Sequence, residues 1–230
     1  QRPGRRTWDV TGHPCAAGRA RRRIPVLAET GAMMPIYTLF ACILDDPQRP
    51  IARSLADCVA ELGTEILEAH AHLRAFQDVI GDKSLRQLQE LYTNAFDLRP
   101  DCTPNLGYHL FGDDARRGLF LAELKGRMES RGMPLGVELP DHIALLLRYL
   151  DIAEEEERTI VIVDCLIPAV ARMVEVLKPG GNPYRHALSA LLSLLRHQRE
   201  GFRMSADAGE PAIECAPVVA MNNAVFNILE

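Results

Sequence analysis

The chain has 230 residues, of which 47% are hydrophobic and 25% charged, a composition able to bury one core of domain size. Its net charge of -5 is uneven, because residues 1–33 hold seven arginines against Asp9 and Glu29 while the remainder holds 19 basic and 29 acidic residues. An acidic body is unsuited to nucleic acid, since phosphate contacts require clustered Lys and Arg. The longest apolar run, TIVIVDCLIPAVA at 159–171, contains Asp164 and is too short to span a bilayer.

The first 33 residues differ from the rest, being rich in Arg, Gly and Pro without apolar periodicity. We expect them to be a disordered or extraneous basic segment, with Met33 or Met34 as the natural start; a basic interaction arm is the alternative. The six cysteines lie far apart and form no C-x-x-C pair. With no recognisable signal peptide, they indicate reduced thiols in a cytoplasmic protein.

From Met34 onward the sequence has helical periodicity almost throughout. In IARSLADCVAEL, at 51–62, apolar residues recur at the spacing of an amphipathic helix. The segment 69–81 continues the pattern and can end at Gly81. Ser84 is placed to cap a further helix, SLRQLQELYTNAFD, at 84–97. These patterns predict a helical first half.

The second half alternates predicted loops and helices. RPDCTPNLG, at 99–107, is predicted to be a loop. The segment 112–132 is predicted to be a helix, because it has Asp residues at its start and basic residues before Gly132, in the order that the helix dipole favours. GMPLGVELP is a linker, and Asp141 after Pro140 is expected to cap the next helix, an interaction typically worth about 1 kcal/mol.

The segment 159–177 is ambiguous, because IVIV has the β-branched character of a strand but no partner strand is recognisable. We predict a buried helix kinked near Pro168. YRHALSALLSLLRHQ then forms the final helix, and residues 200–230 lack periodicity and are expected to be an irregular tail. The fold class is therefore predicted to be all-α, with one helical bundle domain at 34–199.

Catalytic and metal motifs are not recognisable in the sequence, which lacks G-x-S-x-G, H-E-x-x-H and a P-loop. His70 and His72 point in different directions on a helix, and His186 and His197 are about three turns apart. A metal site would have to combine distant segments, so we expect no metal, no cofactor and no catalytic residue.

Asp141 and His142 form a possible dyad, on which a metal- or nucleotide-dependent hydrolase could be centred. The simpler interpretation is that Asp141 caps a helix and His142 is a neutral hydrogen-bonding residue in its first turn. The helix that follows is apolar nearly all round, so it is buried or borders a groove that receives another apolar element. Glu154–Glu157 are expected to form a solvated linker, with attraction of a basic peptide as the alternative.

A set of motifs runs through the segments 91–125 and 138–150 and ends at 182–184: Tyr-x-x-x-Phe-Asp, a Cys, a Tyr, Gly-Asp, Arg-Gly, Glu-Leu-Pro-Asp-His and a closing Asn-Pro-Tyr. The residues of this set are Tyr92, Phe96, Asp97, Cys102, Tyr108, Gly112, Asp113, Arg117, Gly118, Glu138, Leu139, Pro140, Asp141, His142, Asn182, Pro183 and Tyr184. As a set they resemble the delta-subunit (NarJ-type) assembly chaperones of respiratory nitrate reductase, within the TorD-like group of chaperones for molybdenum enzymes. The resemblance spans roughly residues 36–199.

The resemblance implies an all-helical, non-enzymatic, cytoplasmic protein, either a monomer or a weak dimer. It would bind the N-terminal peptide of the catalytic subunit of nitrate reductase or a related molybdenum oxidoreductase. It would hold that subunit until the molybdenum cofactor is inserted, before membrane docking or export. A permanent subunit of the reductase complex is the alternative.

Two sets of residues are expected to form the peptide site. Glu138, Pro140, Asp141 and His142 would lie in a hinge loop, and Tyr92, Phe96, Tyr108, Leu146 and Tyr149 would border the groove. For the aromatic residues, packing in the core is the alternative. Asp97, Gly112, Asp113, Arg117, Pro183 and Tyr184 would be structural, with Arg117 pairing with Asp113 or Asp114.

Overall fold

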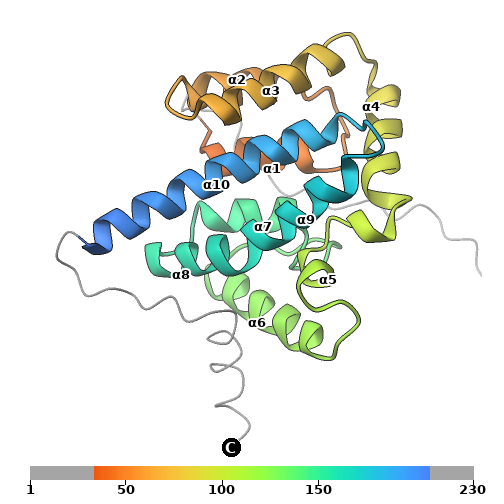
Figure 1. Ribbon diagram of the computed structural model, residues 1–230. Helices are drawn as coiled ribbons and strands as arrows, with labels where there is room; N and C mark the ends of the chain where they lie inside the picture. The colour runs from red at the N-terminus through yellow and green to blue at the C-terminus, as the bar shows by residue number, and fades with distance from the viewer. Residues whose placement is uncertain (1–33, 208–230) are drawn as a thin grey trace, which may run out of the picture.

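The computed structural model describes residues 34–207, and every regular element in that range is helical (Figure 1). The pairing of Asn105 with His142 is an isolated bridge outside any strand. The all-α prediction is therefore confirmed. No helix in the described range is both long and apolar enough to cross a bilayer.

The helices follow one another with short connections. In chain order they are α1 (Ile36–Leu44), α2 (Ala52–Leu62), α3 (Leu67–Ile80), α4 (Leu85–Tyr92), the π-helical turn η1 (Thr93–Asp97), the 3-10 turn η2 (Pro100–Cys102), α5 (Leu106–Phe111), α6 (Arg116–Ser130), α7 (Ile143–Leu150), α8 (Glu155–Ile160), the π-helical turn η3 (Val161–Leu166), α9 (Ile167–Leu177) and α10 (Tyr184–Asp207).

The long helix α10 organises the bundle, running between α3 on one side and α9 on the other (Figure 1). Helix α1 packs against both α7 and α2, and α5 packs against α6 and α9. Seven of the eight residues of α7 are buried, all except Arg148. This burial confirms that α7 is an interior helix, whose apolar side chains contribute to the hydrophobic core.

Local sequence signals account for several helix boundaries. Ser84 forms a capping box with Gln87 at the start of α4, as predicted for Ser84. Helix α6 ends before Gly132, whose φ of 69° is left-handed backbone that glycine adopts without strain. Asp114 accepts a hydrogen bond from the backbone N–H of Arg116 at the beginning of α6.

The predicted helix at 159–177 is confirmed, but the run begins earlier and is not regular. It consists of α8, the π-helical turn η3 and α9, and Ile167 N–H donates to the carbonyl of Ile162, five residues back. Pro168 follows directly and has no N–H of its own to donate. The π-helical turn is therefore the irregularity that accompanies Pro168 in this helix.

Two predictions of irregular structure are corrected. Helix α10 continues to Asp207, so residues 200–207 are helical despite their weak apolar periodicity. Helix α8 begins at Glu155, so the four glutamates are not a linker. Their negative charges lie at the helix N-terminus, where the helix dipole stabilises them. The predictions for residues 1–33 and 208–230 fall outside the described residues.

Candidate functional site

The connection between α6 and α7, residues 131–142, is held by backbone hydrogen bonds to the turn before α5. Leu106 N–H donates to the carbonyl of Asp141 at 2.9 Å, and Ile143 N–H donates to that of Pro104 at 2.9 Å. His142 N–H donates within the loop to Leu139 O at 3.0 Å. The end of this loop is therefore fixed to the segment at the start of α5, although both α5 and α6 lie between the two in the sequence.

Asp141 is not the cap of α7, contrary to the sequence prediction. It is fully buried, with 0% of its surface exposed, and its carboxylate oxygen Oδ2 accepts from Gly107 N–H at 3.0 Å. A Cβ atom on Gly107 would lie 2.8 Å from that oxygen, so the contact requires glycine. The carbonyl of Asp141 accepts from Leu106 N–H and is not part of the first turn of α7. Helix α7 therefore begins at Ile143, directly after His142.

His142 caps α7 instead. Its Nδ1 accepts from Ala144 N–H at 3.2 Å, and the residue is 5% exposed. The Nδ1 atom thereby satisfies one of the free N–H groups of the first turn. The structure thus confirms a hydrogen-bonding role for His142, although as the cap of α7 and not as a residue of its first turn. Asp141 and His142 each have a structural partner of their own.

The Asp141 carboxylate also lies near Arg117 of α6, with Nη2 3.7 Å from Oδ2. Arg117 was expected to pair with Asp113 or Asp114, and that prediction is wrong; Arg116 pairs with Asp114 at 3.1 Å. Burial raises the pKa of Asp141 above its usual value, and this effect outweighs the opposing influence of Arg117 and Gly107. Its ionised form is therefore disfavoured by the fold.

The predicted site residues divide between surface and core. Glu138 and Pro140 are half-buried in the loop, beside the exposed side chains of Val137 and Leu139. Tyr108 is half-buried, and the Arg117 guanidinium lies 6.0 Å from the centre of its ring. The structure thus brings Tyr108, Arg117 and Asp141 together at the base of the loop.

The remaining predicted groove residues, Tyr92, Phe96, Leu146 and Tyr149, are buried. Tyr92 and Phe96 pack edge-to-face against Tyr184 at the start of α10, with ring centres 5.7 Å and 5.2 Å from that of Tyr184. This is the core packing given as the alternative for the aromatic residues. A part in peptide binding stays a prediction for all of them.

The predicted structural residues lie at helix junctions. Gly112 ends α5 with φ 62°, and the Asp97 carboxylate accepts from the Thr93 hydroxyl within η1 at 3.1 Å. Asn182 accepts from Tyr184 N–H at 3.0 Å and donates to Leu91 O at 2.9 Å, which joins the start of α10 to α4. Pro183 is buried beside it and Asp113 is exposed.

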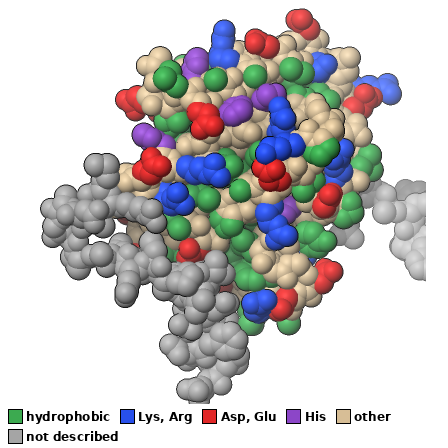
Figure 2. Space-filling view, in the orientation of Figure 1, with side chains coloured by type: hydrophobic (Ala, Val, Ile, Leu, Met, Phe, Trp, Pro, Cys, Tyr) green, Lys and Arg blue, Asp and Glu red, His purple; other side chains and the backbone are tan. Residues whose placement is uncertain are grey.

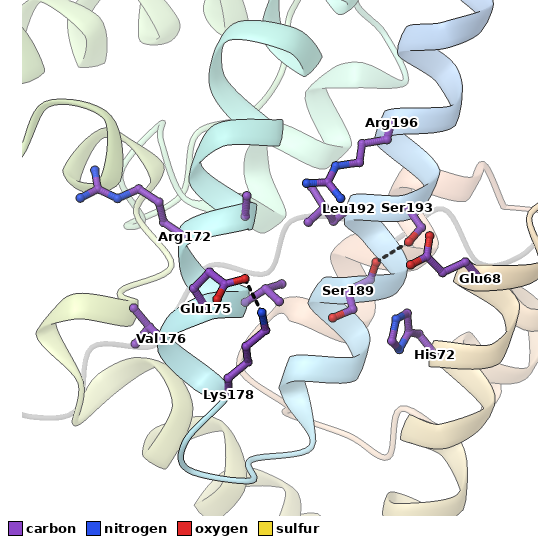
Figure 3. A pocket seen from close by; sticks show the side chains of 12 residues that line it. Glu68, His72, Arg172, Glu175, Val176, Lys178, Ser189, Leu192, Ser193 and Arg196 are labelled. Atoms are coloured by element: carbon purple, nitrogen blue, oxygen red, sulfur yellow. Dashed lines mark hydrogen bonds and ion pairs between the residues drawn. The ribbon is translucent and has the colours of Figure 1, made fainter.

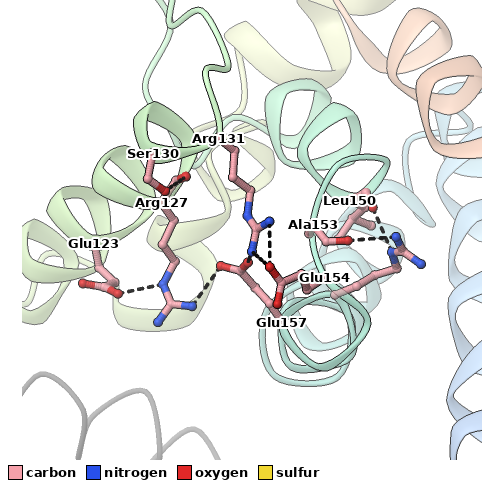
Figure 4. Close-up of polar contacts among 9 residues, drawn as sticks. Glu123, Arg127, Ser130, Arg131, Leu150, Ala153, Glu154 and Glu157 are labelled. Atoms are coloured by element: carbon pink, nitrogen blue, oxygen red, sulfur yellow. Dashed lines mark hydrogen bonds and ion pairs between the residues drawn. The ribbon is translucent and has the colours of Figure 1, made fainter.

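An ion-pair cluster between α6 and α8 was not foreseen from the sequence (Figure 4). Glu157, with 11% of its side chain exposed, binds Arg127 at 2.9 Å and Arg131 at 2.8 Å. Burial acts to raise the pKa of Glu157, but neighbouring Tyr149, Arg127 and Arg131 outweigh it and hold the pKa below its usual value. Spacing along one helix could not reveal these pairs, because the partners are on different helices.

A cavity of about 500 Å³ lies between α3, α9 and α10 (Figure 3). Its walls include Glu68 and His72 from α3, Glu175 from α9, Lys178 directly after α9, and Arg196 from α10. Near it, His72 Nδ1 lies 3.4 Å from Nδ1 of His186. Within residues 34–207, no group of three or more His, Cys, Asp or Glu side chains is arranged to hold a metal ion.

Comparison with known proteins identifies the family. The model of the family described as nitrate reductase delta subunit matches residues 60–189, more than half of the chain. The chain belongs to this family. A relative named "Probable nitrate reductase molybdenum cofactor assembly chaperone NarJ", from Bacillus subtilis (strain 168), is 26% identical over 166 residues, which cover 70% of this chain and 88% of the relative. The part matched to the nitrate reductase delta subunit family includes Arg117, the loop before α7 and Tyr184.

Proposed function

We propose that this protein is a cytoplasmic, non-enzymatic chaperone for a molybdenum oxidoreductase, either nitrate reductase or a relative. It binds the N-terminal peptide of the catalytic subunit and assists molybdenum cofactor insertion before membrane docking or export. The observation that carries the proposal is membership of the nitrate reductase delta subunit family over residues 60–189. The name of the Bacillus subtilis relative supports the same function.

The loop before α7 is the proposed recognition element. Val137 and Leu139 are 66% and 44% exposed, and the Glu138 carboxyl group lies between them in sequence. Exposed apolar side chains beside a carboxylate suit an amphipathic peptide that carries a basic residue. Leu146 and Tyr149 are buried in α7, so their part in peptide binding requires a movement that exposes this helix.

Burial weighs against the hydrolase alternative. Asp141 is 0% exposed and His142 is 5% exposed, so a substrate has no direct access to either side chain. A general base must reach the proton that it removes, within hydrogen-bond distance or through one water. The Asp141 side chain instead contacts α5 and α6, and the His142 side chain caps α7.

Calorimetric titration tests the peptide-binding step. The titrant is a synthetic peptide of roughly the first 25 residues of the catalytic subunit encoded beside this protein, a length that suits a groove-bound helix. The expected result is saturable binding at micromolar concentration and no binding of a scrambled peptide. Absence of heat for the native peptide, at concentrations where micromolar binding would be seen, contradicts the proposal.

The same titration with the variant Glu138→Lys tests whether Glu138 contacts the peptide. Glu129→Lys, on the exposed surface of α6, is the matched control. Reversal of one charge at the proposed contact is expected to weaken binding by about tenfold, because like charges oppose each other across an interface. The control should bind as the unsubstituted protein does. Equal affinities for the two variants would remove Glu138 from the proposed site.

A permanent subunit of the reductase is the second candidate, favoured by the description of the family as a delta subunit. The two candidates differ in stoichiometry. A permanent subunit co-purifies with the mature reductase in a fixed ratio, whereas a chaperone is found only with the cofactor-free catalytic subunit.

A further inference from the structure

Two histidines from distant parts of the chain meet where α3 packs on α10. His72 Nδ1 and His186 Nδ1 are joined by a long hydrogen bond of 3.4 Å, and the ring centres are 5.7 Å apart with an interplanar angle of 40°. Both side chains are half-buried. Helix α10 makes its most extensive contact with α3, so the packing of these two helices holds the rings together.

This contact depends on the number of protons that the two rings carry. A hydrogen bond between two Nδ1 atoms requires one ring to donate its Nδ1–H and the other to accept through a free lone pair. Two neutral rings can form this bond, and so can one neutral and one protonated ring. When both rings are protonated, each Nδ1 carries a hydrogen, so the bond is lost and two positive charges face each other.

The groups nearest the pair disfavour protonation of both rings. Burial, the neighbouring Arg185 and His72 each lower the pKa of His186, in this order of effect. Glu68 lies one turn before His72 on α3, but it is exposed, so solvent screens its charge. Within residues 34–207, no hydrogen bond or ion pair joins a carboxylate to either ring.

The other charged side chains beside the pair line the adjoining cavity of about 500 Å³ (Figure 3). Among them, the Glu175 carboxylate is bound to Lys178 at 2.5 Å. Arg172 and Arg196 add two further cations, and both are exposed. On the face seen in Figure 2, His side chains lie beside Lys and Arg as well as acidic side chains. The cavity wall therefore does not neutralise a doubly protonated pair.

The buried part of the same interface does not titrate near neutral pH. Phe76, one turn after His72 on α3, packs against Tyr184 of α10 with ring centres 5.3 Å apart. Both of these rings are fully buried. Loss of the histidine contact would therefore loosen the cavity side of the interface, while the apolar packing of the core side remains.

We propose that His72 and His186 form a proton-sensitive clasp, which holds α3 against α10 near neutral pH and is released when both rings are protonated. Because the pKa of His186 is lowered in the folded state, the unfolded chain binds the proton more tightly. The stabilisation is therefore present above the ordinary histidine pKa of about 6.5 and is lost as pH falls through the folded-state value. The clasp goes beyond the proposed chaperone function and does not depend on it.

A double-mutant cycle on the full chain tests the clasp. His72→Ala, His186→Ala and the double variant are compared with the unsubstituted protein by urea denaturation between about pH 7.5 and about pH 4.5, a range that spans the histidine pKa. Such a cycle isolates the coupling between two side chains from their separate contacts. The coupling should be favourable at the upper end of the range, and should vanish or become unfavourable at the lower end.

The matched control is the same cycle on His70 and His197, which lie on the same two helices. This cycle should show no coupling at either end of the pH range. If an alanine variant does not fold, His72→Leu or His186→Leu takes its place, because leucine restores apolar volume without a polar group. Absence of coupling near pH 7.5, or equal coupling at both ends, overturns the clasp.

Amide hydrogen exchange of the unsubstituted protein gives a readout that needs no variant. After correction for the intrinsic effect of pH on exchange, amides around His72 and in the first turns of α10 should lose protection by about tenfold between pH 7.5 and pH 4.5. The buried helix α7 is the internal reference and should lose less. Unchanged protection around the two histidines, or an equal loss in α7, contradicts local release of α3 from α10.

Discussion

Arg117 and Asp141 meet across the junction of α6 and α7, with Nη2 3.7 Å from Oδ2. Asp141 has no exposed surface, whereas 25% of the Arg117 side chain is exposed. The same carboxylate oxygen accepts from Gly107 N–H. One side chain therefore joins three helices at the base of the proposed recognition loop.

Substitution of Asp141 should test this joining role. Asp141→Ala leaves the buried N–H of Gly107 without an acceptor and is expected to lower the free energy of unfolding by about 2–3 kcal/mol. Asp141→Asn keeps an acceptor oxygen and should cost about 1 kcal/mol or less. Urea denaturation followed by circular dichroism measures both. Equal losses in the two variants would show that the hydrogen bond from Gly107 is not the important contact.

The free energy of unfolding should depend on pH in the way expected of a buried carboxylic acid, because Asp141 is buried. Burial raises the pKa of Asp141 in the folded state, so that state binds the proton more tightly than the unfolded chain. Stability attributable to Asp141 is therefore greatest at acidic pH and is lost as pH rises through the folded-state pKa. Relative to Asp141→Asn, the unsubstituted protein should gain stability between pH 7 and pH 4.5, as measured by urea denaturation. A constant difference, or one of opposite sign, would contradict the raised pKa.

The Glu157 cluster should contribute more than a surface ion pair. Glu157→Gln weakens contacts with Arg127 and Arg131 at a side chain only 11% exposed, and about 1–2 kcal/mol of stability is expected to be lost. Glu123→Gln is the matched control, since Glu123 also binds Arg127 but is 35% exposed, and should cost less than about 0.5–1 kcal/mol.

The Glu157 effect has a defined pH window. The pKa of Glu157 is lowered in the folded state, so its stabilisation is present above the unfolded pKa and is lost as pH falls through the folded value. The difference between the protein and Glu157→Gln should shrink on acidification. A difference that grows toward low pH would be incompatible with these ion pairs.

Tyr184 should stabilise the fold through the packing of its ring and not through a hydrogen bond of its hydroxyl group. The residue is fully buried among Phe76, Tyr92 and Phe96, and among the described residues its hydroxyl has no hydrogen-bond partner. Tyr184→Phe is expected to be neutral or slightly stabilising, whereas Tyr184→Ala should cost about 3–5 kcal/mol. Thermal denaturation distinguishes the two outcomes.

Tyr37→Phe is the control for the hydroxyl group. The Tyr37 hydroxyl donates to Gln198 Oε1 at 2.6 Å and so links α1 to α10. Its removal should cost about 1 kcal/mol. If Tyr184→Phe proved as damaging as Tyr37→Phe, the Tyr184 hydroxyl would have a partner that these contacts do not reveal.

Local signals in the sequence predicted the helical architecture well. The apolar stripe at 51–62, the capping box at Ser84 and the apolar character of α7 each depend on residues within a few positions of one another. The end of α10 was missed, because continuation to Asp207 is not marked by a strong apolar stripe. The π-helical turn before Pro168 was predicted only as a kink.

Long-range contacts at the candidate site could not be predicted in this way. Asp141 follows a proline and precedes an apolar helix, which is the local pattern of a cap, yet its carboxylate accepts from Gly107. Arg117 lies at helical spacing from Asp113 and Asp114 but contacts Asp141. His72 and His186 are likewise brought together only by the packing of α3 on α10. In each case the deciding partner is distant in sequence.

The most direct test of the chaperone function is the molybdenum content of the reductase made with and without this protein. The reductase subunits are expressed in cells with and without the chaperone gene, the catalytic subunit is purified, and molybdenum is measured per polypeptide. A chaperone of this kind should leave the catalytic subunit with little molybdenum when it is absent, and give full loading when it is present without remaining bound to the mature enzyme. Equal molybdenum content in the two preparations would contradict the proposed chaperone function.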